Sequence, residues 1–255
     1  MNTLFTRLRN CSESRPAPQV PDGVRVYAVG DIHGRSDLLD GLHIRIREDL
    51  MAQPSHQTII VYLGDYIDRG SDSPGVLQRL CGPAIEGTER ILLKGNHEQM
   101  LERFLATPET GTMWRQLGGT ETLLSYGVDV KSAFGKGGLA HMAAQLREKI
   151  PQAHRQLMAS LQVSTTIGDY FFCHAGARPK IPLDRQDPAD LLWIRNEFLA
   201  SDYAFEKTIV HGHSPVEDAE FHEYRINIDT GAYATGRLTC LVLSSKEQRL
   251  ICARL

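Results

Sequence analysis

The chain has 255 residues, of which 42% are hydrophobic and 23% charged, and its formal net charge is −3. This composition is that of an ordinary folded protein, and the length suits one large domain or one domain with an inserted cap. The weak negative charge argues against a general nucleic-acid binder, and no stretch approaches the roughly 20 apolar residues of a membrane-spanning helix. We therefore expect neither a nucleic-acid partner nor a membrane partner.

The five cysteines are scattered and form no C-x-x-C pair, so neither a disulfide framework nor a zinc knuckle is expected. A reducing, cytoplasmic setting fits this cysteine usage best. Residues 1–22 are rich in Ser and Pro and have no apolar core of signal-peptide length, which predicts a flexible N-terminal tail. Residues 23–255 are predicted to form a single domain.

Five short apolar runs, each typical of a buried strand, end near a glycine and then deliver polar residues. The run at residues 59–63 leads into GDYIDRG at 64–70, which holds two carboxylates and a guanidinium. The other runs lead into GDIHG at 30–34, KGNHE at 94–98, HAG at 174–176 and HGH at 211–213. Because loops at strand ends place polar groups on a rigid scaffold, we expect all five ends to converge on one site.

Helical patterns follow the first two of these strands. Apolar positions between residues 38 and 50 share one helical face with Ser36 as the expected cap, and a second helix is expected to begin at Ser73-Pro74 and close at Gly82. Strands that alternate with helices predict parallel pairing with helices packed outside the sheet.

Between about residues 98 and 165 the pattern is helical, which predicts a helical cap beside the site; helices that only complete the core are the alternative. Strands return at 170–173, 208–210, 225–228, 238–243 and 249–253. The last three are joined by short turns and are predicted to form an antiparallel meander. The second half of the chain is expected to form another sheet packed on the first.

The strand ends supply a mixed set of oxygen and nitrogen ligands. Such a set suits Mn²⁺, Fe or Zn²⁺ better than Ca²⁺ or a thiolate-bound zinc. Two ions about 3.5–4 Å apart, bridged by one carboxylate, would use the whole set and clamp the attacking and leaving oxygens of a phosphoryl displacement. The candidate metal ligands are Asp31, His33, Asp65, Asn96, His174 and His213.

Three further residues fit the remaining roles in such chemistry. Arg69 is suited to grip phosphate oxygens bidentately. His97 can protonate the leaving alkoxide as a general acid, while Asp68 accepts from its other nitrogen and fixes the tautomer. Glu98 is expected to be structural, since His97 already fills the acid role.

The motifs GDIHG, GDYIDRG and GNHE, followed by CHAG and HGHSP, resemble those of the phosphoprotein phosphatase (PPP) family of metallophosphoesterases, particularly its short bacterial and phage members. The resemblance covers residues 24–243. It implies an α/β, calcineurin-like metallophosphoesterase fold in which a two-sheet β-sandwich is flanked by helices. It also implies two divalent metal ions, Mn²⁺ first and Fe or Zn²⁺ as alternatives.

Carried over by position, the family pattern implies which residues hold each ion. Asp31, His33 and Asp65 would bind the first ion, and Asp65, Asn96, His174 and His213 the second. The pattern places the last ligand at His213, so His211 is expected to support the site without binding metal.

The remaining site residues follow from the same resemblance. Phosphate would be held by Arg69, Asn96 and Arg195, the last from a segment similar to the family's Leu-x-Trp-x-Arg. A buried helix start with an arginine beside it is the alternative explanation for Arg195. His97 and Asp68 would be the acid pair.

The resemblance implies a phosphomonoesterase that acts on a phosphorylated protein or peptide, on Ser/Thr or Tyr phosphate, by direct attack of metal-bound hydroxide without a phosphoenzyme. Symmetrical diadenosine tetraphosphate hydrolases are similar in fold and in the segment IDTGA at 228–232, but usually have Ala at the position of Asp68, which favours the phosphatase. Dinucleoside polyphosphate hydrolysis is therefore the alternative. A catalytically silent module that recognises phosphorylated partners is a remote one, because no ligand or acid is missing.

Overall fold

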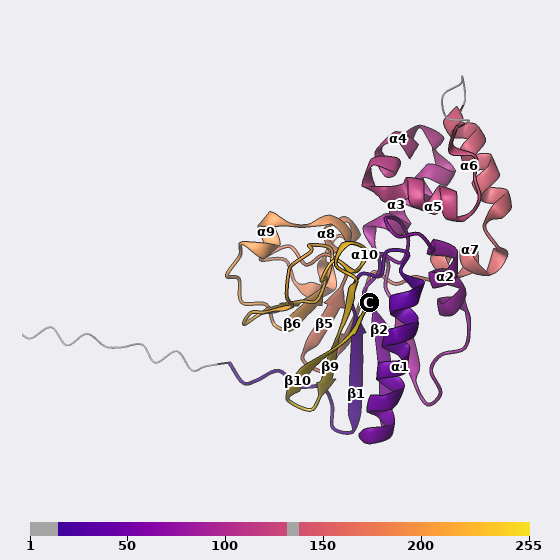
Figure 1. The fold of residues 1–255 in the computed structure, drawn as a ribbon. Helices are drawn as coiled ribbons and strands as arrows, with labels where there is room; N and C mark the ends of the chain where they lie inside the picture. Colours follow the sequence, from indigo (N-terminus) through magenta and orange to yellow (C-terminus); the bar gives the residue numbers. More distant parts are fainter. Residues whose placement is uncertain (1–14, 132–137) are drawn as a thin grey trace, which may run out of the picture.

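The computed structural model describes residues 15–131 and 138–255, which form two five-stranded sheets with helices around them (Figure 1). The strand order of the first sheet is β10-β9-β1-β2-β3 and that of the second is β4-β5-β6-β8-β7. The strands are β1 (Val24–Val29), β2 (Gln57–Tyr62), β3 (Glu89–Leu92), β4 (Ser164–Ile167), β5 (Tyr170–Cys173), β6 (Thr208–His211), β7 (Glu220–Phe221), β8 (Arg225–Asn227), β9 (Arg237–Ser244) and β10 (Glu247–Arg254). The predicted two-sheet α/β architecture is confirmed.

Two long connections and a series of cap helices surround these sheets. The α-helices are α1 (Ser36–Ala52), α2 (Ser73–Cys81), α3 (Asn96–Ala106), α4 (Gly111–Trp114), α5 (Thr120–Ser125), α6 (Gly138–Lys149), α7 (Gln152–Ala159), α8 (Pro188–Trp193), α9 (Asn196–Leu199) and α10 (Ala232–Thr235). Short 3-10 turns lie at Pro108–Thr110 and Leu183–Arg185, and a π-type turn lies at Arg115–Gly119. None of the helices in the described ranges is long and apolar enough to cross a bilayer.

The crossover helices α1 and α2 join strands that pair in parallel, as the alternation of strands and helices predicts. β1 pairs in parallel with β2, and β2 with β3. In the second sheet β5, β6 and β8 are also parallel. The carboxyl ends of β1, β2 and β3 therefore meet at one edge of the first sheet, and those of β5 and β6 at one edge of the second.

The predicted antiparallel meander of three strands is wrong. β9 and β10 do form an antiparallel hairpin, but β9 joins the first sheet beside β1. β8 instead pairs in parallel with β6 in the second sheet. The short helix α10 lies between β8 and β9, and this connection carries the chain from one sheet to the other.

Alternating side chains on the strands build a separate core on each face. Val26 and Ala28 of β1 pack between the sheets with Tyr170 and Phe172 of β5, all almost fully buried. The neighbouring Tyr27 of β1 faces the opposite way, into the core under the helices. Complete burial of one such large apolar side chain contributes about 1.5–3 kcal/mol, so this interdigitation fixes the two sheets as a sandwich.

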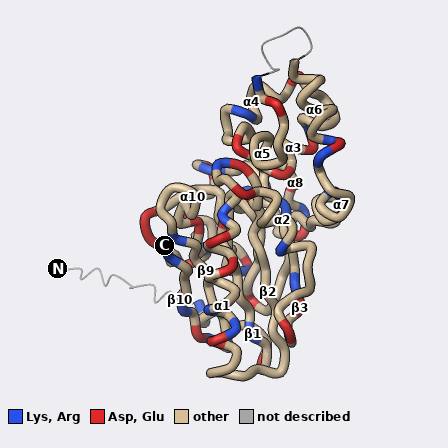
Figure 2. Tube along the Cα trace, turned by 45° about the vertical axis from the view of Figure 1, so that its right-hand side comes forward, with Lys and Arg blue, Asp and Glu red and all other residues tan. Residues whose placement is uncertain are grey.

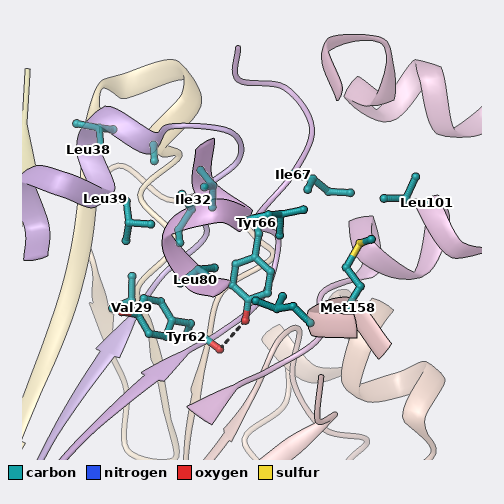
Figure 3. Close-up of a cluster of buried hydrophobic side chains, with 14 of the residues drawn as sticks. Val29, Ile32, Leu38, Leu39, Tyr62, Tyr66, Ile67, Leu80, Leu101 and Met158 are labelled. Atoms are coloured by element: carbon teal, nitrogen blue, oxygen red, sulfur yellow. Dashed lines mark hydrogen bonds between the residues drawn. The ribbon is translucent and has the colours of Figure 1, made fainter. Parts of the chain in front are cut away.

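The core under the helices also anchors the loop that follows β2. Figure 3 shows Tyr66 and Ile67 of this loop among buried side chains of the core. The Tyr66 hydroxyl donates to the Leu93 carbonyl at 2.6 Å and lies 3.3 Å from the Tyr62 carbonyl. The loop is thus tied to β2 and to the segment after β3 by a fully buried side chain.

The described residues between 98 and 163 form the helices α3 to α7 and the turns between them, as the helical pattern predicts, and β4 begins at Ser164. These helices stand above the sandwich at one end (Figure 1). Phe104 and Trp114 are fully buried in the core under the helices. Trp114 and Thr122 also bond to a residue of the site, so the cap both completes the core and reaches the site.

Two helix starts differ from the prediction by one position. Ser36 and Ser73 are the first residues of α1 and α2, and not the caps that precede them. Asp72 caps α2 by accepting from the Gly75 backbone N–H. Ser73 instead lies 3.0 Å from the Thr122 hydroxyl and 3.2 Å from the Asp68 nitrogen, so this hydroxyl links the cap to the site loop.

The predicted N-terminal tail lies partly outside the described residues, which begin at residue 15. Val20 is buried between the two sheets, and its backbone N–H donates to the Ser245 carbonyl at 3.0 Å. The Arg15 guanidinium lies 5.1 Å from the centre of the Tyr224 ring. The described part of the tail therefore packs on the domain.

A partly buried ion pair joins α1 to β10 and provides a first prediction. Asp49 accepts from the Tyr27 hydroxyl at 2.5 Å and from the Arg249 guanidinium at 2.5 and 2.6 Å. Burial pushes the pKa of Asp49 upward, but Arg249 and Tyr27 outweigh burial and hold the pKa below its ordinary value. The carboxylate therefore stabilises the fold above the unfolded pKa of about 3.9, and this stability is lost as the pH falls through the folded pKa.

Asp49→Asn should accordingly lower the free energy of unfolding by about 1–2 kcal/mol at neutral pH. The difference from the parent should shrink at acidic pH, below the ordinary Asp pKa. Urea denaturation at pH 7 and pH 3 measures both values. Asp218→Asn, which removes an exposed partner of Arg237, is the matched control and should change little. An Asp49→Asn effect of equal size at both pH values would contradict the electrostatic explanation.

Candidate metal centre

Polar side chains from five strand ends meet at the edge shared by the two sheets. Asp31 and His33 follow β1, Asp65 follows β2, and Asn96 starts α3 just after β3. His174 and His213 follow β5 and β6 of the second sheet. All six side chains are buried, with exposed fractions of 5% or less. The parallel pairing of the strands brings the predicted ligands together.

One group of ligand atoms has the spacing expected around a single ion. His174 Nε2 lies 2.9 Å from Asn96 Oδ1, 3.2 Å from His213 Nδ1 and 3.4 Å from Asp65 Oδ1. His213 Nδ1 lies 2.8 Å from Asn96 Oδ1. Ligand atoms placed 2.0–2.2 Å from one ion at tetrahedral or octahedral angles lie about 2.8–3.6 Å apart. These four residues are the ones predicted for the second ion.

The ligand atoms of His174, Asn96 and Asp65 are all hydrogen-bond acceptors, so a cation between them would be favourable. His174 Nδ1 lies 3.0 Å from the Leu63 carbonyl, which can only accept, so Nδ1 carries the ring proton and Nε2 is left with a lone pair. That lone pair faces the oxygens of Asn96 and Asp65, which are also acceptors. An extra proton or a metal ion relieves this contact, and burial lowers the pKa of His174, which disfavours the extra proton. The residues present therefore fit a metal ion.

A second group of ligands surrounds the other oxygen of Asp65. His33 Nδ1 lies 2.9 Å from the Ile67 carbonyl, so its Nε2 is free to bind and has no hydrogen-bond partner. That Nε2 lies 3.4 Å from Asp65 Oδ2. The two Asp65 oxygens thus serve different groups, as a bridging carboxylate would.

Asp31 and His97 both border the second group. The ligand atoms of His33, Asp65 and His97 lie within 4.8 Å of one another. Asp31 accepts from the His213 backbone N–H through Oδ2 at 3.0 Å, and its Oδ1 is buried without a partner. Gly212 allows this approach, since a Cβ there would lie 2.0 Å from Asp31 Oδ1. The unpaired carboxylate oxygen suits a metal ligand, and that role of Asp31 stays a prediction.

The charges of the site favour cation binding. Burial raises the pKa of Asp31, and the nearby carboxylates of Asp229 and Asp65 raise it further. Burial lowers the pKa of His33 to about 3 and that of His213 to about 2, so these imidazoles stay neutral and keep their lone pairs. Burial opposes ionisation of Asp65, but positive charge on a neighbouring imidazole, such as that of His97 with its raised pKa, outweighs burial and depresses the pKa of Asp65. A cation would stabilise these buried carboxylates in the ionised form.

His97 and Asp68 form the predicted pair, with 2.7 Å between His97 Nδ1 and Asp68 Oδ2. His97 Nε2 points toward the metal groups and lies 3.7 Å from Asp65 Oδ2. Burial lowers the pKa of His97, but Asp65 and Asp68 outweigh burial and raise it overall. A protonated Nε2 beside the two groups of candidate metal ligands is the geometry that a general acid needs.

The cap fixes Asp68, a role that the sequence pattern does not reveal. The Trp114 indole N–H donates to Asp68 Oδ2 at 2.7 Å, and the Thr122 hydroxyl donates to Asp68 Oδ1 at 2.6 Å. The Thr122 hydroxyl also lies 2.9 Å from the Asp68 backbone nitrogen. Every oxygen of this fully buried carboxylate is therefore oriented by helices α4 and α5 or by His97.

The site loops hold an unusual number of strained residues. Among the described residues, seven other than glycine have positive φ, and five of them lie in the site. These five are His33 (46°), Asp65 (52°), Asp68 (71°), Arg69 (65°) and His213 (65°). Such conformations cost of order 1–3 kcal/mol each, so the surroundings must enforce them.

Glu98 provides much of that enforcement. Its buried carboxylate accepts from the backbone N–H groups of Gly95, Asp65 and Tyr66 at 2.9, 3.0 and 2.8 Å. Burial and the nearby Asp65 raise the pKa of Glu98 to about 7. The expected structural role of Glu98 fits this geometry, because it ties the loop after β2 to the start of α3.

Arg69 and Arg195, the predicted phosphate ligands, approach the centre from two sides. Arg195 donates to the His213 carbonyl at 3.1 Å. The Arg69 guanidinium lies 4.8 Å from the centre of the Tyr233 ring, and Tyr233 contacts the His33 ring at 5.4 Å. His211 is fully buried against Phe198 and lies outside both metal groups.

Tyr233 is a residue that the sequence pattern misses, and its contact with Arg69 gives a second prediction. Tyr233→Ala should raise KM for a phosphate ester roughly 2–5-fold, the value of an exposed cation–π contact. Tyr233→Phe keeps the ring and should resemble the parent. Phe221→Ala, which removes a similarly exposed ring in β7, is the control. Equal KM values for Tyr233→Ala and the parent would show that the ring does not hold Arg69.

A comparison with known proteins places this site in a family. The sequence model of the family described as calcineurin-like phosphoesterase matches residues 24–238. The bis(5'-nucleosyl)-tetraphosphatases PrpE [asymmetrical] of two Bacillus species, B. thuringiensis and B. cereus, are each 27% identical to the chain over 233 residues, covering 84% of this chain and 88% of theirs.

Solved structures share the fold at lower identity. A protein provisionally assigned as a diadenosine tetraphosphatase has a TM-score of 0.61 at 23% identity, covering 90% of this chain and 93% of its own. A cold-active protein tyrosine phosphatase of Shewanella sp. has a TM-score of 0.53 at 17% identity, covering 92% and 83%. The family match spans most of the chain and all the strand ends described above. The chain therefore belongs to the calcineurin-like phosphoesterase family.

Proposed function

We propose that this metal-dependent phosphoesterase hydrolyses dinucleoside polyphosphates, and that phosphoprotein hydrolysis is its second candidate activity. The observation that carries the choice is the similarity to bis(5'-nucleosyl)-tetraphosphatases over 84% of the chain. The sequence motifs alone favour the phosphatase through Asp68. Asp68 distinguishes the chain only from symmetrical hydrolases. The relatives reported above are named asymmetrical, so the presence of Asp68 does not conflict with the similarity to them.

The chemistry rests on the residues at the strand ends. Two divalent ions held there would polarise phosphoryl oxygens and lower the pKa of an attacking water. Asp65 would hold both ions, with His33 and Asp31 on one side and Asn96, His174 and His213 on the other. Mn²⁺ is the proposed metal, since this ligand set suits borderline first-row ions.

Arginines and the His97–Asp68 pair supply the other functions. Arg69 and Arg195 would neutralise the phosphate and orient it. His97 Nε2 would donate a proton to the leaving oxygen, and Asp68 would stabilise the imidazolium through Nδ1. A pair of this kind matters most when the leaving group is an alcohol, which is why phosphoserine or phosphothreonine hydrolysis remains the second candidate.

The distribution of charge supports a small anionic substrate over a nucleic acid. Figure 2 shows acidic and basic residues interspersed along the described chain, consistent with the net charge of −3. Positive charge beside the metal groups comes from single arginines such as Arg69 and Arg195. The described cysteines are free thiols, which agrees with the proposed cytoplasmic setting.

The experiment that tests this proposal compares two substrates side by side. Phosphate or nucleotide release by the Mn²⁺-loaded protein is measured with diadenosine tetraphosphate and with a phosphothreonine peptide, and Asp65→Asn serves as the blank. We expect a higher kcat/KM for the dinucleotide. A higher value for the peptide would overturn the choice and make the protein a phosphoprotein phosphatase.

A further inference from the structure

A pocket of about 510 Å³ opens beside the metal groups, between the cap and the segment after β5. Its walls come from α3, α4, α8 and α9. Met100 is buried at 2% exposure, whereas Met113 is 55% exposed. Trp193 and Ile194 complete the apolar surface. These four side chains are neither candidate metal ligands nor part of the His97–Asp68 pair.

The pocket lies next to the metal centre on the side of His213. The Trp193 indole contacts the His213 imidazole with 6.3 Å between ring centres. Arg195 lines the pocket and donates to the His213 carbonyl. A substrate whose phosphate lies at the metals therefore has space in this pocket for the group attached to that phosphate.

The pocket walls are held in place before any ligand binds. The Trp193 indole N–H donates to Gln99 Oε1 at 2.7 Å, which fixes the plane of the ring. Arg178 forms a two-point contact with Asp190 at 2.5 and 2.6 Å. An oriented indole beside the exposed thioether of Met113 is a surface on which a flat heteroaromatic ring can stack at little entropic cost.

The charge of the pocket suits a phosphorylated ligand. Arg178 is compensated by Asp190. Arg103 and Arg195 also line the pocket, and neither has a carboxylate partner within salt-bridge distance in the described part of the chain. Glu197 also lines the pocket, so three guanidiniums face two carboxylates there. This excess of positive charge next to a stacking surface matches a nucleoside with its phosphates better than the uncharged flank of a peptide.

We propose that this pocket is a nucleoside subsite, in which a purine base stacks on Trp193 beside Met113 and its phosphates point to Arg195 and the metals. The proposal rests on the proposed function for the substrate class. It adds the residues that recognise the base. The competing occupant, a side chain of a phosphopeptide, is an outcome of the test below.

The test is a fluorescence titration of the Mn²⁺-loaded full chain with AMP and with ribose 5-phosphate, which differ only by the base. The chain has two tryptophans, and Trp114 is fully buried, so stacking should quench Trp193. We expect AMP to quench and to bind roughly 5- to 100-fold more tightly than ribose 5-phosphate, as base stacking on an aromatic side chain predicts. Ribose 5-phosphate affinity is obtained by competition with AMP.

Two variants and a control locate the effect. Met113→Asp should reduce the preference for AMP several-fold and leave ribose 5-phosphate binding unchanged, whereas Met51→Asp, at a 77% exposed methionine of α1, should change neither. Trp193→Phe should abolish the quenching and retain part of the preference. Equal binding of the two ligands by the parent, or quenching by a phosphothreonine peptide and not by AMP, would overturn the subsite.

These outcomes are separable from those for the proposed function. The titration measures binding and needs no turnover of a dinucleotide. A preference for AMP that is lost in Met113→Asp supports the subsite even if diadenosine tetraphosphate is not hydrolysed, in which case only the proposed function fails. Hydrolysis of the dinucleotide together with equal binding of AMP and ribose 5-phosphate would leave the function standing and remove the subsite.

Discussion

Asp65→Asn is expected to abolish metal binding and activity together. Among the described residues, Asp65 is the side chain that belongs to both ligand groups, through Oδ1 to His174 and through Oδ2 to His33. Asparagine offers a neutral oxygen on one side and an N–H donor on the other, so it cannot bridge two cations. Loss of metal assistance worth about 4 kcal/mol corresponds to a fall of about 10³-fold in kcat/KM.

Metal content per chain and the metal-induced rise in melting temperature measure this loss directly. Asp218→Asn, far more exposed, should keep metal and activity. An Asp65→Asn protein that retained two ions would contradict the bridging role.

His97→Asn should separate metal binding from proton transfer. The variant keeps a polar group of similar size beside Asp68 and leaves the ligand set intact, so metal content should stay at the level of the parent. Turnover of an alkyl phosphate or a phosphoserine peptide should fall about 10²–10⁴-fold, the typical contribution of a general acid. The loss should be much smaller for p-nitrophenyl phosphate, whose leaving group needs no proton.

The dependence on the leaving group distinguishes this role from a structural one. A misplaced ion would slow every substrate alike, whereas a missing acid slows mainly those with poor leaving groups. Asp68→Asn should show the same trend to a smaller degree, since Trp114 and Thr122 still orient its side chain. Unchanged turnover of the phosphoserine peptide by His97→Asn would show that the acid is another group.

The strand ends and their ligands could be predicted because their signals are local. An apolar run that breaks at glycine into Asp, Asn or His marks a strand and its loop within a few residues. Parallel pairing through α1 and α2 then brings Asp31, Asp65 and Asn96 to one edge. The convergence of this site follows from that topology.

The partners of the last strands could not be predicted in the same way. Turn signals indicate that β9 and β10 form a hairpin, but they do not indicate which sheet the hairpin joins. The pairing of β9 with β1 links residues more than 200 positions apart, such as Val26 with Leu243. This pairing depends on the apolar faces of the strands, and the alternation of apolar residues in the sequence fits either sheet equally well.

Residues that act on the site from the cap were also beyond prediction. Trp114 and Thr122 lie 46 and 54 positions from Asp68, and neither belongs to a motif. From the sequence, Trp114 looks like an ordinary core residue, and the structure does bury it fully. Tyr233 lies in a short helix with no periodic signal, so only the fold places its ring beside Arg69.

Anomalous X-ray diffraction from crystals soaked in Mn²⁺ would locate the metal ions directly. We predict two metal peaks about 3.5–4 Å apart, with Asp65 between them, His33 and Asp31 on one peak, and Asn96, His174 and His213 on the other. A single peak, or a second peak held by His97 or His211 in place of the predicted ligands, would contradict the dinuclear centre.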